Sequence, residues 1–176
     1  WGLWIDAHAD FNPPATSPSG NAHGMPAAAV CGHGDEGLLG LGPRVPMVDP
    51  ARLHLVGVRA VDVDERLLLE RSGAGLHGMD QVDKRGLWSV VEPILARVAA
   101  EGGHRHVGLD VDARDPAIAP GVGTPEPGGL GDEEMLRCLE GVARSGLLGS
   151  VDVMEFNPFF DRYGVTARLV IRCLEH

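Results

Sequence analysis

The feature that most constrains this chain is a series of short, nearly continuous apolar runs, each followed directly by a charged residue. The runs are Gly2–Ile5, His54–Val58, His106–Leu109 and Val151–Met154. Runs of this kind are typical of parallel strands that are buried on both faces of a sheet. The sequence therefore predicts at least four buried strands whose carboxyl ends are polar.

Amphipathic stretches lie between and after these runs. Residues 83–100 and 132–145 carry apolar side chains at the i, i+3, i+4, i+7 spacing of a helix, and a closing helix is predicted over 166–174. Pro93 interrupts the first stretch and predicts either a kink or a later start. Strands that alternate with helices predict an α/β protein with right-handed crossovers.

Two segments rich in Pro and Gly, 12–42 and 115–131, are too long for plain connections. Long loops in a compact α/β domain are usually functional or disordered, and both of these begin at a cluster of carboxylates, which favours function. No internal repeat or linker divides the chain. Residues 1–176 are therefore predicted to form a single domain.

The composition of the chain indicates which partners it does not bind and in which compartment it occurs. The net charge of −10 argues against nucleic acid or an anionic membrane surface as a partner, and no apolar run has the length of about 18 residues that a membrane span needs. The three cysteines are odd in number and lack metal-ligand spacing. Free thiols in a reducing compartment are the simplest interpretation, which predicts a cytoplasmic protein.

The strongest local motif is Asp-Ala-His-Ala-Asp at residues 6–10, directly after the first apolar run. In extended chain, residues i, i+2 and i+4 point the same way, so Asp6, His8 and Asp10 converge. Asp110 and Asp112 follow another run with the same alternation. Because ligands of open α/β sheets bind at the carboxyl ends of the strands, we expect the two clusters to meet there.

Crowded carboxylates are costly without cations, and oxygen ligands with some imidazole suit octahedral Mn²⁺ better than a thiolate zinc site. Two such ions could generate a nucleophile from water at neutral pH. The alternative for any one of these acids is a surface loop residue or a strand-end cap.

Four ordered motifs that together cover nearly the whole chain closely resemble the arginase family of ureohydrolases, within the arginase/agmatinase superfamily. They are Trp-Ile-Asp-Ala-His-Ala-Asp-Phe-Asn at 4–12, Ser-Pro-Ser-Gly-Asn-Ala-His-Gly-Met-Pro at 17–26, Asp-Val-Asp-Ala-Arg-Asp-Pro at 110–116 running into Ala-Pro-Gly-Val-Gly-Thr-Pro at 119–125, and Val-Met-Glu-Phe-Asn-Pro at 153–158. The resemblance implies a three-layer α/β/α fold with a mostly parallel sheet. It also implies hydrolysis of L-arginine to L-ornithine and urea through a hydroxide bridging two Mn²⁺ ions per subunit of the complete protein.

The resemblance also implies a role for each matching residue. Asp6 and Asp110 would bridge the two metals, Asp10 would complete one metal's ligands, and His8 with Asp112 would complete the other's. His23 would relay protons and Glu155 would receive the guanidinium, so the implied catalytic residues are His23, Glu155 and Asp10. The implied contacts to the amino-acid part of the substrate are Asn12, Ser17 and Ser19 for the α-carboxylate, Asp62 for the α-amino group, and Thr124 at the rim. The family is commonly trimeric or hexameric, so a homo-oligomer is expected.

Each of these residues has a simpler alternative. Asp62 could cap the helix that follows it, and Ser17 and Ser19 could be turn residues beside Pro18. His23 alone would be an ordinary loop histidine, and Glu155 an ordinary strand-end acid.

The sequence departs from the family in three places. The family's upstream Gly-Gly-(Asp/Asn)-His segment, which supplies one more metal ligand, is not found here, so we expect an N-terminally incomplete domain that lacks the first strands and is a poor catalyst by itself. Arg114 stands where the family usually has an apolar residue, which would place a cation close to the metals and beside Asp115. Glu126-Pro127 is a pattern more typical of agmatinases.

The leading prediction is therefore an arginase. The first alternative is an agmatinase or another guanidino-acid ureohydrolase, and the second is a non-catalytic remnant that binds at most one metal.

Overall fold

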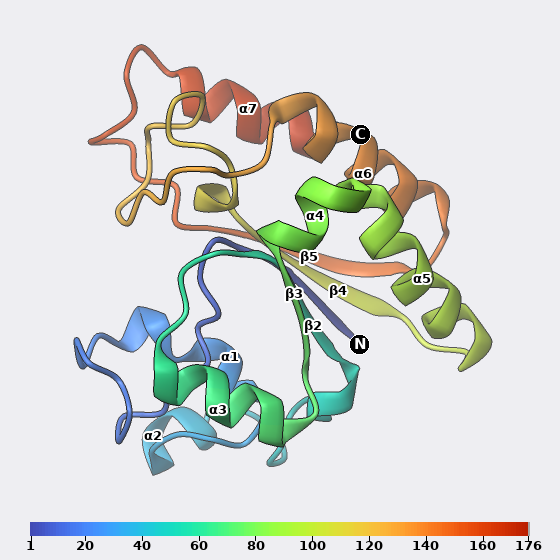
Figure 1. Cartoon of the computed structure of the whole chain (residues 1–176). Helices are drawn as coiled ribbons and strands as arrows, with labels where there is room; N and C mark the ends of the chain where they lie inside the picture. The colour runs from blue at the N-terminus through green and yellow to red at the C-terminus, as the bar shows by residue number, and fades with distance from the viewer. Residues whose placement is uncertain (176) are drawn as a thin grey trace.

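A five-stranded, fully parallel sheet forms the centre of the computed structural model, which describes residues 1–175 (Figure 1). The strands are β1 (Gly2–Ile5), β2 (Leu53–Val58), β3 (Gly75–Gly78), β4 (Arg105–Asp110) and β5 (Leu148–Met154). They lie in the order β3-β2-β1-β4-β5, so the first strand of the chain is central. The predicted α/β class and parallel sheet are confirmed.

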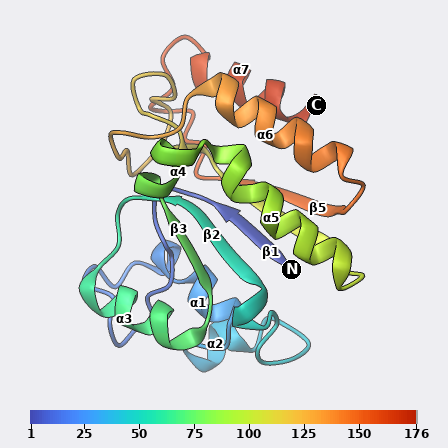
Figure 2. The ribbon, with the colours of Figure 1, turned by 45° about the vertical axis from the view of Figure 1, so that its right-hand side comes forward.

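Helices cover both faces of the sheet, as the two views in Figures 1 and 2 show. One face carries α1 (Pro26–Val30) and α3 (Val63–Ser72), with the short α2 (Glu36–Leu39) beside α1. The other face carries α4 (Met79–Arg85), α5 (Leu87–Ala100), α6 (Asp132–Arg144) and α7 (Val165–Leu174). The predicted three layers are therefore present. Among residues 1–175, no helix is long and apolar enough to cross a bilayer.

The register of the central strands brings their carboxyl ends level. Ile5 pairs with Val56 on one side and with Leu109 on the other, so Asp6 and Asp110 follow these paired residues at the same edge. Leu3 and Ile5 are fully buried among the residues of α5 and α6, and this packing fixes β1 between the layers.

The helix predicted over 83–100 is two helices. It begins earlier, as α4, and the break lies at Gly86, whose φ of 80° and ψ of 146° no helix accommodates. A helix start at Pro93 is wrong, because α5 begins at Leu87 and continues through the proline. The helices predicted over 132–145 and 166–174 are confirmed to within one residue at either end.

Two features of the sheet differ from expectation. Strand β3 was not predicted, because its sequence Gly-Leu-His-Gly contains one aliphatic side chain only. Strand β5 is present, but the expectation that it is buried on both faces is wrong. It lies at an edge of the sheet, and Val151 and Met154 are 40% and 52% exposed.

Candidate metal centre and substrate cavity

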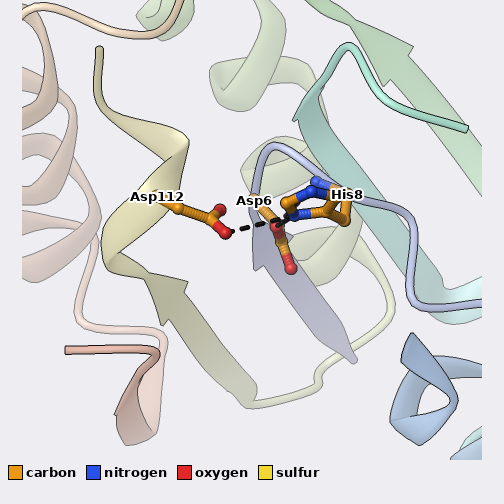
Figure 3. A group of neighbouring side chains, drawn as sticks. All are labelled: Asp6, His8 and Asp112. Atoms are coloured by element: carbon orange, nitrogen blue, oxygen red, sulfur yellow. Dashed lines mark hydrogen bonds and ion pairs between the residues drawn. The ribbon is translucent and has the colours of Figure 1, made fainter. Parts of the chain in front are cut away.

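Three of the predicted metal ligands meet at the carboxyl ends of β1 and β4 (Figure 3). Nδ1 of His8 lies 3.1 Å from Oδ2 of Asp112 and 3.5 Å from Oδ1 of Asp6. One ligand atom from each residue lies within 4.8 Å of the others. Both carboxylates are buried, while a quarter of the imidazole is exposed. The cluster is thus open on the histidine side.

Hydrogen bonds orient these carboxylates. Oδ1 of Asp6 accepts from the backbone N–H of His8 at 2.7 Å, and its Oδ2 accepts from Nε1 of Trp4 at 2.9 Å. Asp112 accepts from the backbone N–H of Ala7 at 3.3 Å, a bond that ties the β4 end to the β1 end. The shared edge of the sheet therefore brings the first and the second acidic motif together, although Asp112 lies in a 3-10 turn (Val111–Ala113) and not in extended chain.

Asp10 and Asp110 lie in the same electrostatic environment. Burial, followed by the charge of Asp6, raises the pKa of Asp10 to about 8 and that of Asp110 to about 10. Burial also raises the pKa of Asp6. Asp10 has a left-handed φ of 51°, a conformation that costs free energy in a non-glycine residue and occurs often at functional sites. Several buried acids that repel one another form a natural cation site.

His8 is the only basic group of the three-residue cluster, and it is paired. Hydrogen bonds that the imidazole donates to Asp112 and then to Asp6 raise the pKa of His8 to about 11. Burial would raise the pKa of Asp112, but its hydrogen bond and ion pair with His8 hold that pKa below the usual value. A divalent cation bound here would take the place of the His8 proton as the counter-charge.

The donor set fits a hard or borderline divalent cation. Carboxylate oxygens and one imidazole nitrogen converge, and no thiol lies in the cluster, because the three cysteines are buried elsewhere in the fold. Such ligands suit Mn²⁺ among the first-row metals.

A cavity of about 200 Å³ opens beside the cluster. Its wall contains Asn12, whose Nδ2 donates to Oδ2 of Asp62 at 3.0 Å. The loop at 17–23 and the start of α3 close it. Eight residues predicted for the site line this cavity: His8, Asp10, Asn12, Ser17, Ser19, His23, Asp62 and Thr124. Oγ1 of Thr124 also donates to Oδ2 of Asp112 at 3.2 Å, which connects the rim to the cluster.

Asp110 and Glu155 line a second cavity, of about 360 Å³, and Asp10 and His23 line both cavities. Glu155 follows β5 and has a φ of 60°, the second strained non-glycine position among the predicted site residues. All of the predicted site residues except Asp6 and Asp112 therefore line one or both of these cavities, which share Asp10 and His23. A larger cavity of about 940 Å³ lies between α5 and α6 and contains none of them.

The simpler alternatives for three residues are also visible. Asp62 is the N-cap residue of α3. Ser17 and Ser19 accept hydrogen bonds from the backbone N–H groups of Gly20 and Asn21, at 3.0 and 3.2 Å. A capping or turn role is compatible with a place in the cavity wall.

Sequence reasoning gave no role to three residues beside the site. Glu65 is buried and accepts from the backbone N–H groups of Phe11 at 2.7 Å and of Asp62 at 3.0 Å. Its place three residues after the N-cap was the available signal. Arg59 contacts the turn that carries Asp112, and Oε1 of Glu126 lies 4.0 Å from Nε2 of His8.

Among the described residues, the Arg114 guanidinium makes no ion pair with Asp115. It is buried, contacts Sγ of Cys173 on α7 and lies 3.7 Å from Asp132 on α6. Asp115 instead accepts from the backbone N–H groups of Ala117 and Gly128. Arg114 therefore connects the site's turn to the helical layer.

The fold is that of a known family. The family model for arginases matches residues 2–176, so the chain belongs to the arginase family. The arginase of Brevibacillus brevis is 41% identical over 169 residues, which are 96% of this chain and 57% of that protein.

Solved structures agree. The arginase of Bacillus subtilis superposes with a TM-score of 0.94 at 37% identity, over 99% of this chain and 60% of that one. The arginase of Entamoeba histolytica, determined in complex with L-ornithine, superposes with a TM-score of 0.91 at 32% identity, over 98% of this chain and 58% of that one. The chain thus spans less than two thirds of the length of the relatives that it matches.

Proposed function

We propose that this chain is the greater part of the catalytic domain of an arginase, which hydrolyses L-arginine to L-ornithine and urea. The observation that carries the proposal is the cavity lined by Asn12, Ser17, Ser19 and Asp62, directly beside the buried acidic cluster. Amide, hydroxyl and carboxylate groups there suit the charged α-amino acid end of arginine. The acidic cluster suits the cations that this hydrolysis needs.

Two Mn²⁺ ions are the proposed cofactors. Asp6 and Asp110 would lie between them, Asp10 would complete one ligand set, and His8 with Asp112 would complete the other. The buried acids lie close together and their pKa values are raised, which supports the binding of metal cations at this position. Bound there, the ions would supply Lewis acidity and lower the pKa of water to near neutrality.

The remaining residues bind and orient the substrate. Glu155 would hold the guanidinium, because a carboxylate matches that planar cation with two acceptors. Asp62 would accept from the α-amino group, while Asn12, Ser17 and Ser19 would donate to the α-carboxylate. Thr124 would shape the rim.

The proposed proton carrier is His23. It is exposed and borders both cavities, a position from which it can deliver a proton to the leaving amine.

The proposed compartment, oligomeric state and partners are those expected for the family. We propose a cytoplasmic homo-oligomer, a trimer or a hexamer, that acts on a small molecule and not on nucleic acid or a membrane. The three buried free thiols support a reducing compartment.

An agmatinase or another guanidino-acid ureohydrolase is the second candidate. Glu126 favours it, because its carboxylate lies near His8 and adds negative charge there. That charge would repel the α-carboxylate of arginine, which agmatine lacks. The donor groups of Asn12, Ser17 and Ser19 favour arginine instead.

Urea release tests the choice. The chain is loaded with Mn²⁺ and incubated with L-arginine or agmatine at equal concentration. Faster release from arginine is expected, because agmatine lacks the α-carboxylate and leaves the buried Asn12 amide without that partner, at about 1–3 kcal/mol. Equal or faster release from agmatine would move the assignment to the second candidate, and a chain that binds at most one Mn²⁺ and releases no urea from either substrate would favour a non-catalytic remnant.

A further inference from the structure

Arg59 follows β2 and has no assigned role in the proposed chemistry, yet its guanidinium is the most heavily bonded group beside the site. Every bond goes to a backbone carbonyl oxygen. Nη1 donates to Gly57 at 3.3 Å and to Ala113 at 3.2 Å. Nη2 donates to Asp112 at 2.8 Å, to Arg114 at 3.3 Å and to Glu126 at 2.7 Å. Nε donates to Glu126 at 3.3 Å and to Pro127 at 3.1 Å.

These carbonyls belong to three separate segments. They are the end of β2, the 3-10 turn after β4, and the loop at 126–127. In addition, the backbone N–H of Arg59 donates to the carbonyl of Ala7 at 2.9 Å, within the first motif of the site. One side chain and its own backbone thus join three segments beside the site to the segment that carries His8.

The segments that Arg59 holds carry functional atoms. The turn carries the Asp112 carboxylate, which contacts His8 through Oδ2 and the N–H of Ala7 through Oδ1. The loop begins near Thr124, which donates to the same carboxylate, and carries Glu126 beside His8. A shift in either segment would therefore move a proposed metal ligand or its neighbour.

The geometry indicates that Arg59 acts through the several N–H donors of its guanidinium and not through its charge alone. Within the described part of the chain, no carboxylate oxygen lies within ion-pair distance of the Arg59 guanidinium, although Asp112 and Glu126 act on it electrostatically. Gly129 leaves room for it, because a Cβ there would lie 2.6 Å from Nη2. A lysine ammonium has three donors on one atom and cannot reach carbonyls spread over three segments.

We propose that Arg59 is a positioning residue, which fixes Asp112 and the 124–127 loop for metal and substrate binding by bonding their backbone carbonyls. This inference rests on the proposed metal centre. Groups that orient metal ligands commonly change metal affinity by about 10–100-fold when removed.

The test compares Mn²⁺ binding and amide exchange in three variants of the whole chain. Arg59→Met removes the donors and the charge, whereas Arg59→Lys keeps the charge but not the fork. Arg114→Met is the matched control, since it removes a buried guanidinium that contacts the α6 and α7 side chains and no carbonyl of the site. Mn²⁺ affinity is measured by calorimetric titration, at a denaturant-free condition where circular dichroism shows each variant folded.

We expect Mn²⁺ to bind about 10–100-fold more weakly to both Arg59 variants and within about twofold of the wild type to Arg114→Met. Wild-type affinity in Arg59→Lys would overturn the proposal in favour of simple charge compensation. Equal weakening in Arg114→Met would overturn it in favour of general loosening of the turn.

Amide exchange in the metal-free chain separates this inference from the proposed function. The N–H of Leu130 bonds the carbonyl of Ala113 at 2.9 Å, and that of Asp115 bonds the carbonyl of Leu130 at 3.2 Å. Both amides should exchange faster in the Arg59 variants than in the wild type. Unchanged exchange would refute the positioning role, while a wild-type chain that binds no Mn²⁺ would refute the metal centre itself.

Discussion

Replacement of Glu65 tests how the site is held together. Its carboxylate accepts from two backbone N–H groups, that of Phe11 in a fully buried bond and that of Asp62 in a partly buried one. Asp10 precedes Phe11, so this carboxylate connects the metal-cluster loop with the start of α3. Glu65→Leu leaves both donors without their acceptor, whereas Glu65→Gln keeps one acceptor oxygen.

The magnitude follows from the burial of the two donors. A buried N–H left unpaired costs about 1–3 kcal/mol, and water can replace the acceptor of the partly exposed Asp62 N–H. We therefore expect Glu65→Leu to lower the free energy of unfolding by about 2–4 kcal/mol and Glu65→Gln by about 1–3 kcal/mol.

The assay is urea unfolding followed by circular dichroism, with the slope of the transition compared between variants. Glu70→Gln is the matched control, because Glu70 is exposed on the same helix. It should change the free energy by no more than about 0.5 kcal/mol. A Glu65→Leu chain as stable as this control would refute the reasoning that the carboxylate joins the two segments.

The remaining predictions concern the guanidinium site and acid stability. Glu155→Gln removes the negative charge and one good acceptor, so kcat/KM for arginine should fall about 10–100-fold with Mn²⁺ content unchanged; loss of metal would show that Glu155 is itself a ligand. Burial, followed by the charge of His77, lowers the pKa of His54 to about 4 from 6.5. The unfolded chain therefore takes up this proton first, so stability is full above pH 6.5 and falls as the pH drops toward 4. His54→Phe keeps the stack on Trp1 without titrating, and its unfolding free energy should vary less between pH 6.5 and 4; an unchanged slope would contradict this.

The sequence predicts the parts of the fold that depend on strong local patterns. Apolar runs locate β1, β2, β4 and β5, and the 3.6-residue period locates α6 and α7. It misses β3, which is held by pairing with β2 and not by its own composition. Periodicity alone also continues a helix across Gly86, since the left-handed φ there interrupts the backbone without disturbing the apolar pattern.

The same division applies to the site. Asp6, His8 and Asp112 are predictable because they follow two neighbouring strands that end at the same edge of the sheet. Arg59 is not, because its partners are backbone carbonyls, which leave no mark in the sequence. Glu65 is intermediate, as its spacing from Asp62 indicates a capping pair but not its bond to Phe11.

The number of Mn²⁺ ions bound per chain tests the proposed two-metal centre most directly. After equilibrium dialysis against Mn²⁺ and removal of free ion, the metal in the wild-type chain and in Asp110→Ala is measured by mass spectrometry. We expect two ions per wild-type chain and fewer in the variant, because a carboxylate between the two cations is lost and they then repel each other. A wild-type chain with one ion or none, or an Asp110→Ala chain that keeps two, would contradict the account.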